Sequence, residues 1–254
     1  AREKWGENQA NAIWDASTRE VRVGRVMLRS ATISVDVPAP TDPFDAVART
    51  PRELLLFDAQ ASAFRPVKVR GQIVYADSTQ LFLQADEAGL RLLPLGKTDL
   101  KAGDLVDAVG YPEIGGAELL LRETLLKKTG EAPLPSSKKL DDPDLKLKNL
   151  NSTRVQVDGK LLGWHAEERG PVLEMQSGSR LFLARIGSTT TGPLTIRPGS
   201  RLALEGIFVG RGTSQNSSAD NESFELLLNS LTDITVLSQP PWWTLPRLFA
   251  VLGL

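Results

Sequence analysis

Apolar and polar residues alternate from Val67 to Leu95, a stretch that reads VKVRGQIVYADSTQLFLQADEAGLRLLPL. A two-residue period places alternate side chains on one face, so this stretch predicts β-strands. We expect one long strand in VKVRGQIVYA, with a bulge or bend at Gly71, followed by strands in LFLQAD and GLRLLPL. Ala88-Gly89 is expected to supply the turn between the last two strands.

The pattern occurs twice. A second Val-x-Val-x-Gly start stands at Val155 and matches the one at Val67. Each copy continues into a strand bounded by glycines, Gly103–Gly110 and Gly199–Gly206, and then into Glu-Leu-Leu-Leu at Glu118 and Glu225. The segment ELLLRETLLKK after the first of these glutamates has helix-forming residues but follows a glycine turn, and we predict strand for most of it.

About five short strands in roughly 90 residues, with glycine at the bends, are typical of a small closed barrel. Closing the sheet removes its pairing edges, which suits serial units on one chain. The predicted fold class is therefore all-β, with tandem small five-stranded OB-like Greek-key barrels and short helices in the linkers.

Proline-rich and charged segments set the expected boundaries. Pro51 stands where it would open a short helix in PRELLLFD. The expected parts are the C-terminal part of a preceding OB-like unit (1–40), a linker with a short helix (41–63), an OB-like barrel (64–135), a linker (136–151), a second OB-like barrel (152–239) and the start of a transmembrane helix (240–254).

Composition narrows the possible chemistry. The 254 residues contain no cysteine, which excludes disulfides and thiolate zinc sites. Lys and Arg number 30 against 31 Asp and Glu, so the net charge of −1 gives no long-range attraction to nucleic acid. The chain opens mid-pattern in AREKWGENQ, without a signal peptide, and we expect both termini to be cuts within a longer protein.

Several phrases together resemble a known family. PVKVRGQIVYAD, LKAGDLVDAVGYP, the turn into APLP and the terminal QPPWWTLPRLFAVLGL are similar to the extracytoplasmic region of bacterial transmembrane sensor histidine kinases, as are PTDPFD, RELLLFD and FELLLNS. In that family OB-like repeats precede a single transmembrane helix introduced by Pro-x-Trp-Trp-Thr. The resemblance implies a periplasmic segment of an inner-membrane protein, a downstream kinase or other signalling module, a possible homodimer, and no catalytic residues or cofactor in this chain.

The C-terminal residues fit that picture. Trp242 and Trp243 precede an apolar run, as expected for a membrane-interface belt, and Arg247 would extend its charge outward from the lipid. The visible run is shorter than the ~20 residues that span a bilayer, so the rest of the helix would follow Leu254. The alternative is that the two tryptophans pack into the last barrel.

OB folds usually bind ligands on one barrel face through aromatic and basic side chains. The candidates are Tyr75, Phe82, Arg70 and Arg91 in the first copy, and Trp164, Phe182, Arg180 and Arg185 in the second. Phe82 and Phe182 occupy matching Leu-Phe-Leu triplets, which favours core positions for both. Trp164 has no aromatic counterpart in the first copy, which makes it the more distinctive candidate.

Catalytic and metal sites find no support in the sequence. His165 is the only histidine and there is no cysteine, so a transition-metal site is not expected. Asp141, Asp142 and Asp144 begin like a calcium loop but lack its glycine and final glutamate. No Gly-x-Ser-x-Gly nucleophile motif is present, and a hydrolase reading lacks a residue set.

Two functions remain. The first is a non-catalytic extracytoplasmic sensing, ligand-binding or spacer region of a membrane-anchored two-component signalling protein. Its expected partners are the membrane, through the C-terminal helix, and a small ligand or partner protein in the periplasm, with no nucleic acid. The alternative is an OB-fold module that binds single-stranded nucleic acid or an oligosaccharide.

Overall fold

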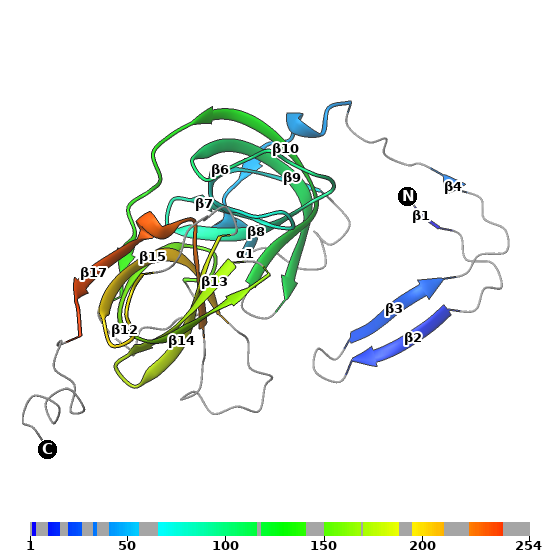
Figure 1. The fold of residues 1–254 in the computed structure, drawn as a ribbon. Coiled ribbons are helices and arrows are strands. Elements are labelled where there is room, and N and C mark those ends of the chain that lie inside the picture. The colour runs from blue at the N-terminus through cyan, green and yellow to red at the C-terminus, as the bar shows by residue number, and fades with distance from the viewer. Residues whose placement is uncertain are drawn as a thin grey trace, which may run out of the picture. The chain divides into compact units, whose positions relative to one another are not determined.

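The computed structural model describes residues 41–55, 66–115, 118–140, 150–168, 170–187, 195–210 and 224–240, together with the backbone of short strands before residue 41 (Figure 1). The chain divides into two compact units, Ala1–Asp45 and Ala46–Leu254. The second unit contains both predicted barrels.

The first unit is built from short antiparallel pairs. Strand β1 (Arg2–Glu3) pairs with β4 (Ile33–Ser34), and β2 (Ala10–Asp15) pairs with β3 (Glu20–Val26). A 3-10 turn, η1 (Pro43–Asp45), closes this unit. The alternating valines between Val21 and Ile33 thus lie partly in strands, as expected from their spacing.

A short helix precedes the first barrel. Strand β5 (Ala48–Arg49) leads into α1 (Pro51–Leu55), which begins at the proline as predicted. The helix start is capped reciprocally, because the Glu53 amide donates to the Thr50 hydroxyl at 3.2 Å and the Thr50 amide donates to the Glu53 carboxylate at 2.8 Å.

The first barrel contains five strands in the order β6-β7-β8-β10-β9, closed by the pairing of β6 with β9. Their bounds are β6 Val67–Ala76, β7 Leu81–Ala85, β8 Ala88–Pro94, β9 Asp104–Gly115 and β10 Glu118–Glu131. All pairs are antiparallel except β8 with β10, which is parallel. This is the five-stranded Greek-key barrel of the OB fold.

The second barrel repeats the same order, as β12-β13-β14-β16-β15 closed by the pairing of β12 with β15. Its bounds are β12 Arg154–Glu167, β13 Gly170–Ser177, β14 Arg180–Ile186, β15 Arg201–Gly210 and β16 Phe224–Leu228. The one parallel pair is again that of strands three and five, β14 with β16. Strand β11 (Lys138–Lys139), inside the predicted linker 136–151, adds in parallel to β12, as β5 adds to β6.

The fifth strand differs between the copies. In the first barrel β10 runs unbroken past a bulge near Glu123, whose φ is 51°. In the second barrel a 3-10 turn, η4 (Leu231–Asp233), interrupts the strand, and β17 (Ile234–Ser238) resumes the pairing with β15. Ser230 and Asp233 form a capping box around this turn. The ambiguous ELLLRETLLKK is therefore strand, as predicted.

The all-β fold of tandem OB-like barrels is confirmed, and so is the repeat on strands one, four and five. Gly71 lies where β6 changes partner from β9 to β7, and Gly159 lies where β12 passes from β15 toward β13. A Cβ on Gly71 would lie 2.5 Å from Leu83 Cδ2 and 2.7 Å from the Gln84 carbonyl oxygen. Glycine permits this close crossing of strands at the bend that closes the barrel.

Two details of the sequence interpretation are wrong. The turn between β7 and β8 lies at Asp86-Glu87, with Asp86 at φ 53°, and Gly89 lies inside β8. The two Leu-Phe-Leu triplets do not correspond, because the first lies on strand two and the second on strand three. Both phenylalanines are buried, but only Phe182 belongs to a barrel core.

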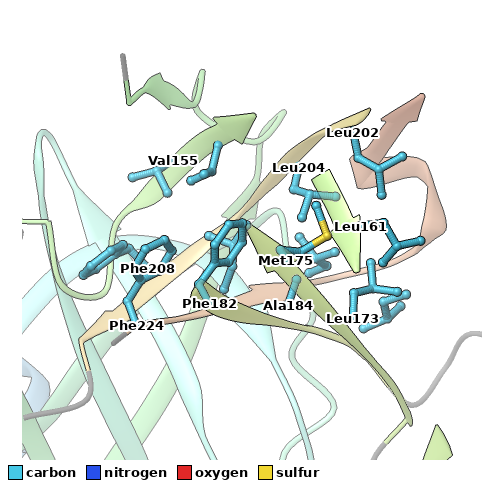
Figure 2. Packing of buried hydrophobic residues seen from close by; sticks show 14 of the residues in the cluster. Val155, Leu161, Leu173, Met175, Phe182, Ala184, Leu202, Leu204, Phe208 and Phe224 are labelled. Atoms are coloured by element: carbon cyan, nitrogen blue, oxygen red, sulfur yellow. The ribbon is translucent and has the colours of Figure 1, made fainter. Parts of the chain in front are cut away.

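Each barrel has its own apolar core. The first is formed by inward residues such as Val69, Ile73, Leu83 and Leu121, all fully buried. Figure 2 shows the second, where Met175 and Leu204 pack with aromatic rings. Phe224 stacks on Phe182 and on Phe208, with ring centroids 4.7 and 4.9 Å apart.

A third apolar cluster joins the barrels, and we call it the joint. Val74, Tyr75 and Phe82 from the first barrel pack against Ile207 and Leu227 from the second, and all five are buried. The Tyr75 and Phe82 rings meet edge to face with centroids 5.9 Å apart. Phe82 is therefore buried between the barrels rather than inside one.

Polar contacts fix the register of the joint. The Arg154 amide donates to Gln84 Oε1 at 2.9 Å, and the Asn229 side-chain amide donates to the Val74 carbonyl at 3.0 Å. The Arg154 guanidinium also holds the connecting segment through the Pro135 carbonyl at 2.9 Å. The backbone of Gly89 lies against the carbonyl of Ser152, so closely that a Cβ on Gly89 would overlap it.

Replacement of Gly89 tests the joint. We expect Gly89→Ala to destabilise the chain by about 2 kcal/mol or more, because backbone atoms on the opposing barrel must move to admit a methyl group. Urea unfolding measures the loss. Gly96→Ala is the control, since a Cβ at Gly96 would meet no atom within 4 Å. Equal midpoints for the two variants would contradict the close packing of the barrels.

Candidate ligand-binding surface

The outer faces of the first three strands decide where a ligand has access, because this is the face on which OB folds bind oligonucleotides and oligosaccharides. In the first barrel this face carries Val74, Tyr75 and Phe82, and the second barrel covers it in the joint. The equivalent face of the second barrel, on β12, β13 and β14, includes exposed side chains. The two copies of one fold thus present their ligand faces differently.

A groove of about 480 Å³ remains at the rim of the joint. The first barrel lines it with Tyr75, Asp77, Ser78, Gln80, Phe82 and Arg91. The second barrel lines it with Glu167, Glu168, Arg185, Val209, Glu225 and Leu227. Four of the predicted ligand residues, Tyr75, Phe82, Arg91 and Arg185, are therefore brought together here from distant parts of the sequence.

Arg185 organises one wall of the groove. Its Nε donates to Glu225 Oε1 at 2.9 Å, and its Nη1 donates to Glu167 Oε2 at 2.6 Å. Burial opposes the charge, but these two hydrogen bonds hold the pKa of Arg185 above its ordinary value. The hydrogen bond from Arg185, with a second from His165, holds the pKa of Glu167 below its usual range. The wall is a preformed guanidinium–carboxylate network.

The opposite rim is a tight turn between β6 and β7. Asp77 accepts hydrogen bonds from the Thr79 amide at 2.8 Å and from the Gln80 amide at 3.0 Å, while its second oxygen accepts from the Gln80 side chain. Burial acts to raise the pKa of Asp77, but these bonds outweigh it and leave the pKa below its usual value. The turn holds Ser78 and Gln80 in place on the groove rim.

The groove is acidic. Its lining contains four carboxylates, Asp77, Glu167, Glu168 and Glu225, against two guanidiniums. Such a lining repels a phosphate but admits a neutral group with several hydrogen-bond donors. Phe82 and Leu227 lie beneath the charges, both almost fully buried in the joint.

The open face of the second barrel has the opposite character at its far end. Cross-strand register aligns Arg201, Lys160, Gln176 and Leu181 in one row over β15, β12, β13 and β14. Neighbours in this row point away from the core, because the adjacent row contains buried Met175 and Phe182. Lys160, Arg201 and Leu181 are exposed, Leu181 by 61%. We call these four residues the basic row; Arg180, the residue before Leu181 at the β13–β14 turn, alternates to the other side of β14.

Trp164 does not lie on this outer face. It pairs across strands with core residue Leu173, so it lies on the inner side of β12 where the strand extends beyond the barrel, 41% exposed. Exposed Leu162 stands beside it at the bulge of β12. His165, next in sequence, is exposed in the strand and hydrogen-bonds Glu167 at 3.1 Å. Trp164 therefore remains available at the barrel rim.

Arg70 has a structural role. Its Nε lies 2.8 Å from Asp107 Oδ1, and Lys68 Nζ lies 3.2 Å from Asp107 Oδ2. The three groups link β6 to β9 on the outside of the first barrel. Tyr75 is likewise committed to the joint, at 3% exposure, and offers no open ring face for stacking.

The remaining predicted positions lie outside the described residues. They are Trp242, Trp243 and Arg247 with the apolar run 241–254, and Asp141, Asp142 and Asp144. Over the described ranges, no helix has the length and hydropathy needed to cross a bilayer, and no cluster of three or more His, Asp or Glu side chains is arranged to hold a metal ion.

Comparison with known proteins finds similar solved structures but no matching family model or curated protein. A solved murine DNA-binding protein bound to double-stranded DNA matches over 69% of this chain and 98% of its own, with 7% identity and a TM-score of 0.33. A HINa domain with a 20-base-pair DNA duplex matches over 63% and 91%, with 8% identity and a TM-score of 0.32. A deletion mutant of the single-stranded DNA binding protein from Thermus aquaticus matches over 72% and 100%, with 14% identity and a TM-score of 0.21.

These matches correct one prediction. The near-zero net charge led us to expect no nucleic-acid partner, whereas the matching solved structures are of DNA-binding proteins, two of them holding duplex DNA. At these scores and identities the likeness is one of fold alone. Net charge averages over all faces, while the register partners Lys160 and Arg201 lie side by side on one of them, so a near-zero net charge was a poor ground for the prediction.

Sequence reasoning missed the residues of the basic row and Glu168. No motif marks them, and they come together only through strand register and barrel order. The alternation along β12 and β14 did indicate which positions point outward, but not which outward positions become neighbours.

The Arg70–Asp107 pair makes a pH prediction. The hydrogen bond from Arg70, aided by Lys68 and opposed by burial, holds the pKa of Asp107 below its usual value. An acid with a depressed folded-state pKa stabilises the fold above its unfolded pKa, and this contribution is lost as the pH falls through the folded value. We expect Asp107→Asn to cost about 1–3 kcal/mol at pH 7, measured by urea unfolding, with the gap closing below about pH 4.

Asp99→Asn, in an exposed loop, is the matched control and should leave stability unchanged at both pH values. A loss at pH 7 that persisted undiminished at pH 3 would show that packing, and not the ion pair, explains the effect.

Proposed function

We propose that this chain is a non-catalytic OB-fold binding module that takes single-stranded nucleic acid on the open face of its second barrel. One observation carries the proposal. Of the two faces on which OB folds bind ligands, the first is closed by the joint, and the second is open with a basic row beside exposed apolar side chains.

The chemistry of this face suits a single strand. The exposed register partners Lys160 and Arg201 supply positive charge for the phosphate backbone. Leu181 and Leu162, at 61% and 42% exposure, supply apolar surface for bases, while Trp164 is exposed at the adjoining rim on the inner side of β12. Single-strand sites of OB folds combine these two features, charge for the backbone and planar or apolar contact for the bases.

Charge reversal in the basic row tests the proposal. We expect wild type to bind a fluorescent oligo(dT) of about 20 nucleotides, and Lys160→Glu with Arg201→Glu to weaken binding by about ten-fold or more at low salt. Fluorescence anisotropy across a salt series should give a slope of about −1.4 in log affinity against log salt, since two neutralised phosphates contribute about −0.7 each.

Lys97→Glu is the control, because Lys97 is exposed between β8 and β9 of the first barrel and is not part of the basic row. It should leave binding unchanged. Equal loss in the control and the double variant would show non-specific attraction, and absence of binding by wild type would refute the proposal. The sequence also left an oligosaccharide open as the ligand. An oligosaccharide on the same face would bind without this salt dependence.

The sensor-kinase resemblance, with its periplasmic location and membrane anchor, stays a prediction. It depends on the segment from Pro241 onward, which lies outside the described residues. The anisotropy experiment tests single-strand binding and does not test membrane anchoring.

A further inference from the structure

The groove at the joint differs from the open face in shape and in charge. Its volume of about 480 Å³ falls in the range of small-molecule sites, roughly 300–1,000 Å³. Both barrels build it, so it exists only while the joint holds them together. The basic row attracts a polyanion, whereas the excess of carboxylates in the groove repels one.

The groove and the open face are continuous along β14. Leu181 in the basic row and Arg185 in the groove wall stand four residues apart on this strand, about 13 Å at the usual strand rise. Leu183, between them, is the register partner of groove residue Glu225. A single-stranded nucleic acid bound over the basic row therefore lies within a few nucleotides of the groove.

The polar groups of the groove match a base and not a backbone. Glu168 is exposed at the rim and offers two carboxylate oxygens as acceptors. Arg185 uses Nε and Nη1 on Glu225 and Glu167, and a guanidinium carries further N–H donors on Nη2. Glu168 and Arg185 thus line one space together with the side chains of Phe82 and Leu227.

Among the bases, guanine fits this combination best. Its Watson–Crick edge presents two adjacent N–H donors, which a carboxylate accepts together, and its O6 and N7 accept from a guanidinium. Thymine and uracil present one N–H, and adenine and cytosine present an amino group beside an acceptor that a carboxylate repels. A carboxylate-rich pocket accordingly selects for paired donors.

We propose that the groove receives one base of the strand bound on the open face and prefers guanine, with Glu168 accepting from its Watson–Crick edge. This inference rests on the proposed function, since it uses the same strand. It adds sequence preference to a face that by itself reads only charge and stacking.

The test uses two probes on the whole chain. The first is oligo(dT) with one dG introduced at successive positions, measured by anisotropy. The second is guanosine, an uncharged nucleoside that has no phosphate for the basic row, measured by calorimetry beside adenosine, cytidine and uridine. We expect one favoured dG position with about a ten-fold gain over oligo(dT), and a similar preference for guanosine.

Two variants place the preference in the groove. Glu168→Gln should remove most of the gain from dG while leaving affinity for oligo(dT) unchanged or slightly higher. Ser78→Trp, at the exposed rim, should block the groove by its size and have the same effect. Glu87→Gln is the control, because Glu87 is an exposed carboxylate in the β7–β8 turn, outside the groove lining.

The outcomes separate this inference from the proposed function. Binding of oligo(dT) with no gain from dG at any position would overturn the guanine preference and leave the proposed function intact. Selective binding of guanosine with no binding of oligonucleotides would support the groove and refute single-strand binding on the open face. Binding of a neutral saccharide such as maltose in the groove, with no nucleoside bound, would overturn the inference.

Discussion

The burial of one barrel's ligand face against the next barrel is the constraint on which the rest of this structure depends. Val74, Tyr75 and Phe82 point outward from the first barrel and would be exposed if that barrel stood alone. The second barrel covers them with Ile207 and Leu227 from its fourth and fifth strands. An apolar contact of this kind, with buried rings from Tyr75 and Phe82, favours one fixed arrangement of the two barrels.

The joint also explains why two copies of one fold expose different faces. The backbone of Gly89 lies against Ser152, and Arg154 and Asn229 donate hydrogen bonds across the joint. These contacts leave no room for a ligand on most of the first barrel's face. What is left of that face is the groove, and its second wall comes from the other barrel. The second barrel keeps its face open, with Lys160 and Leu181 exposed on it.

Local sequence pattern predicted the barrels because it reports which face of a strand is buried. Alternation located β6 and β12, and Gly71 and Gly159 marked the bends at which each first strand changes partner. The Leu-Phe-Leu triplets misled, because alternation around Phe82 and Phe182 is the same whether the buried side faces a barrel core or a neighbouring barrel. Burial by a second domain leaves no separate periodic signal, so neither the joint nor the groove was predictable from the chain alone.

Tertiary structure also decides which of the candidate residues are open to a ligand and which have a structural role. Arg70 and Tyr75 have the composition of a ligand site but are used for structure, the first in a pair with Asp107 and the second in the joint. Lys160 and Arg201 lack any motif, yet the pairing of β12 with β15 sets them side by side. Because antiparallel neighbours lie about 5 Å apart, two isolated charges in the sequence become one local field on the surface, and whole-chain neutrality gives no information about it. A single-stranded nucleic acid attracted by these charges would reach the acidic groove a few residues along β14. There the attraction of its phosphates would end and the recognition of a base could begin.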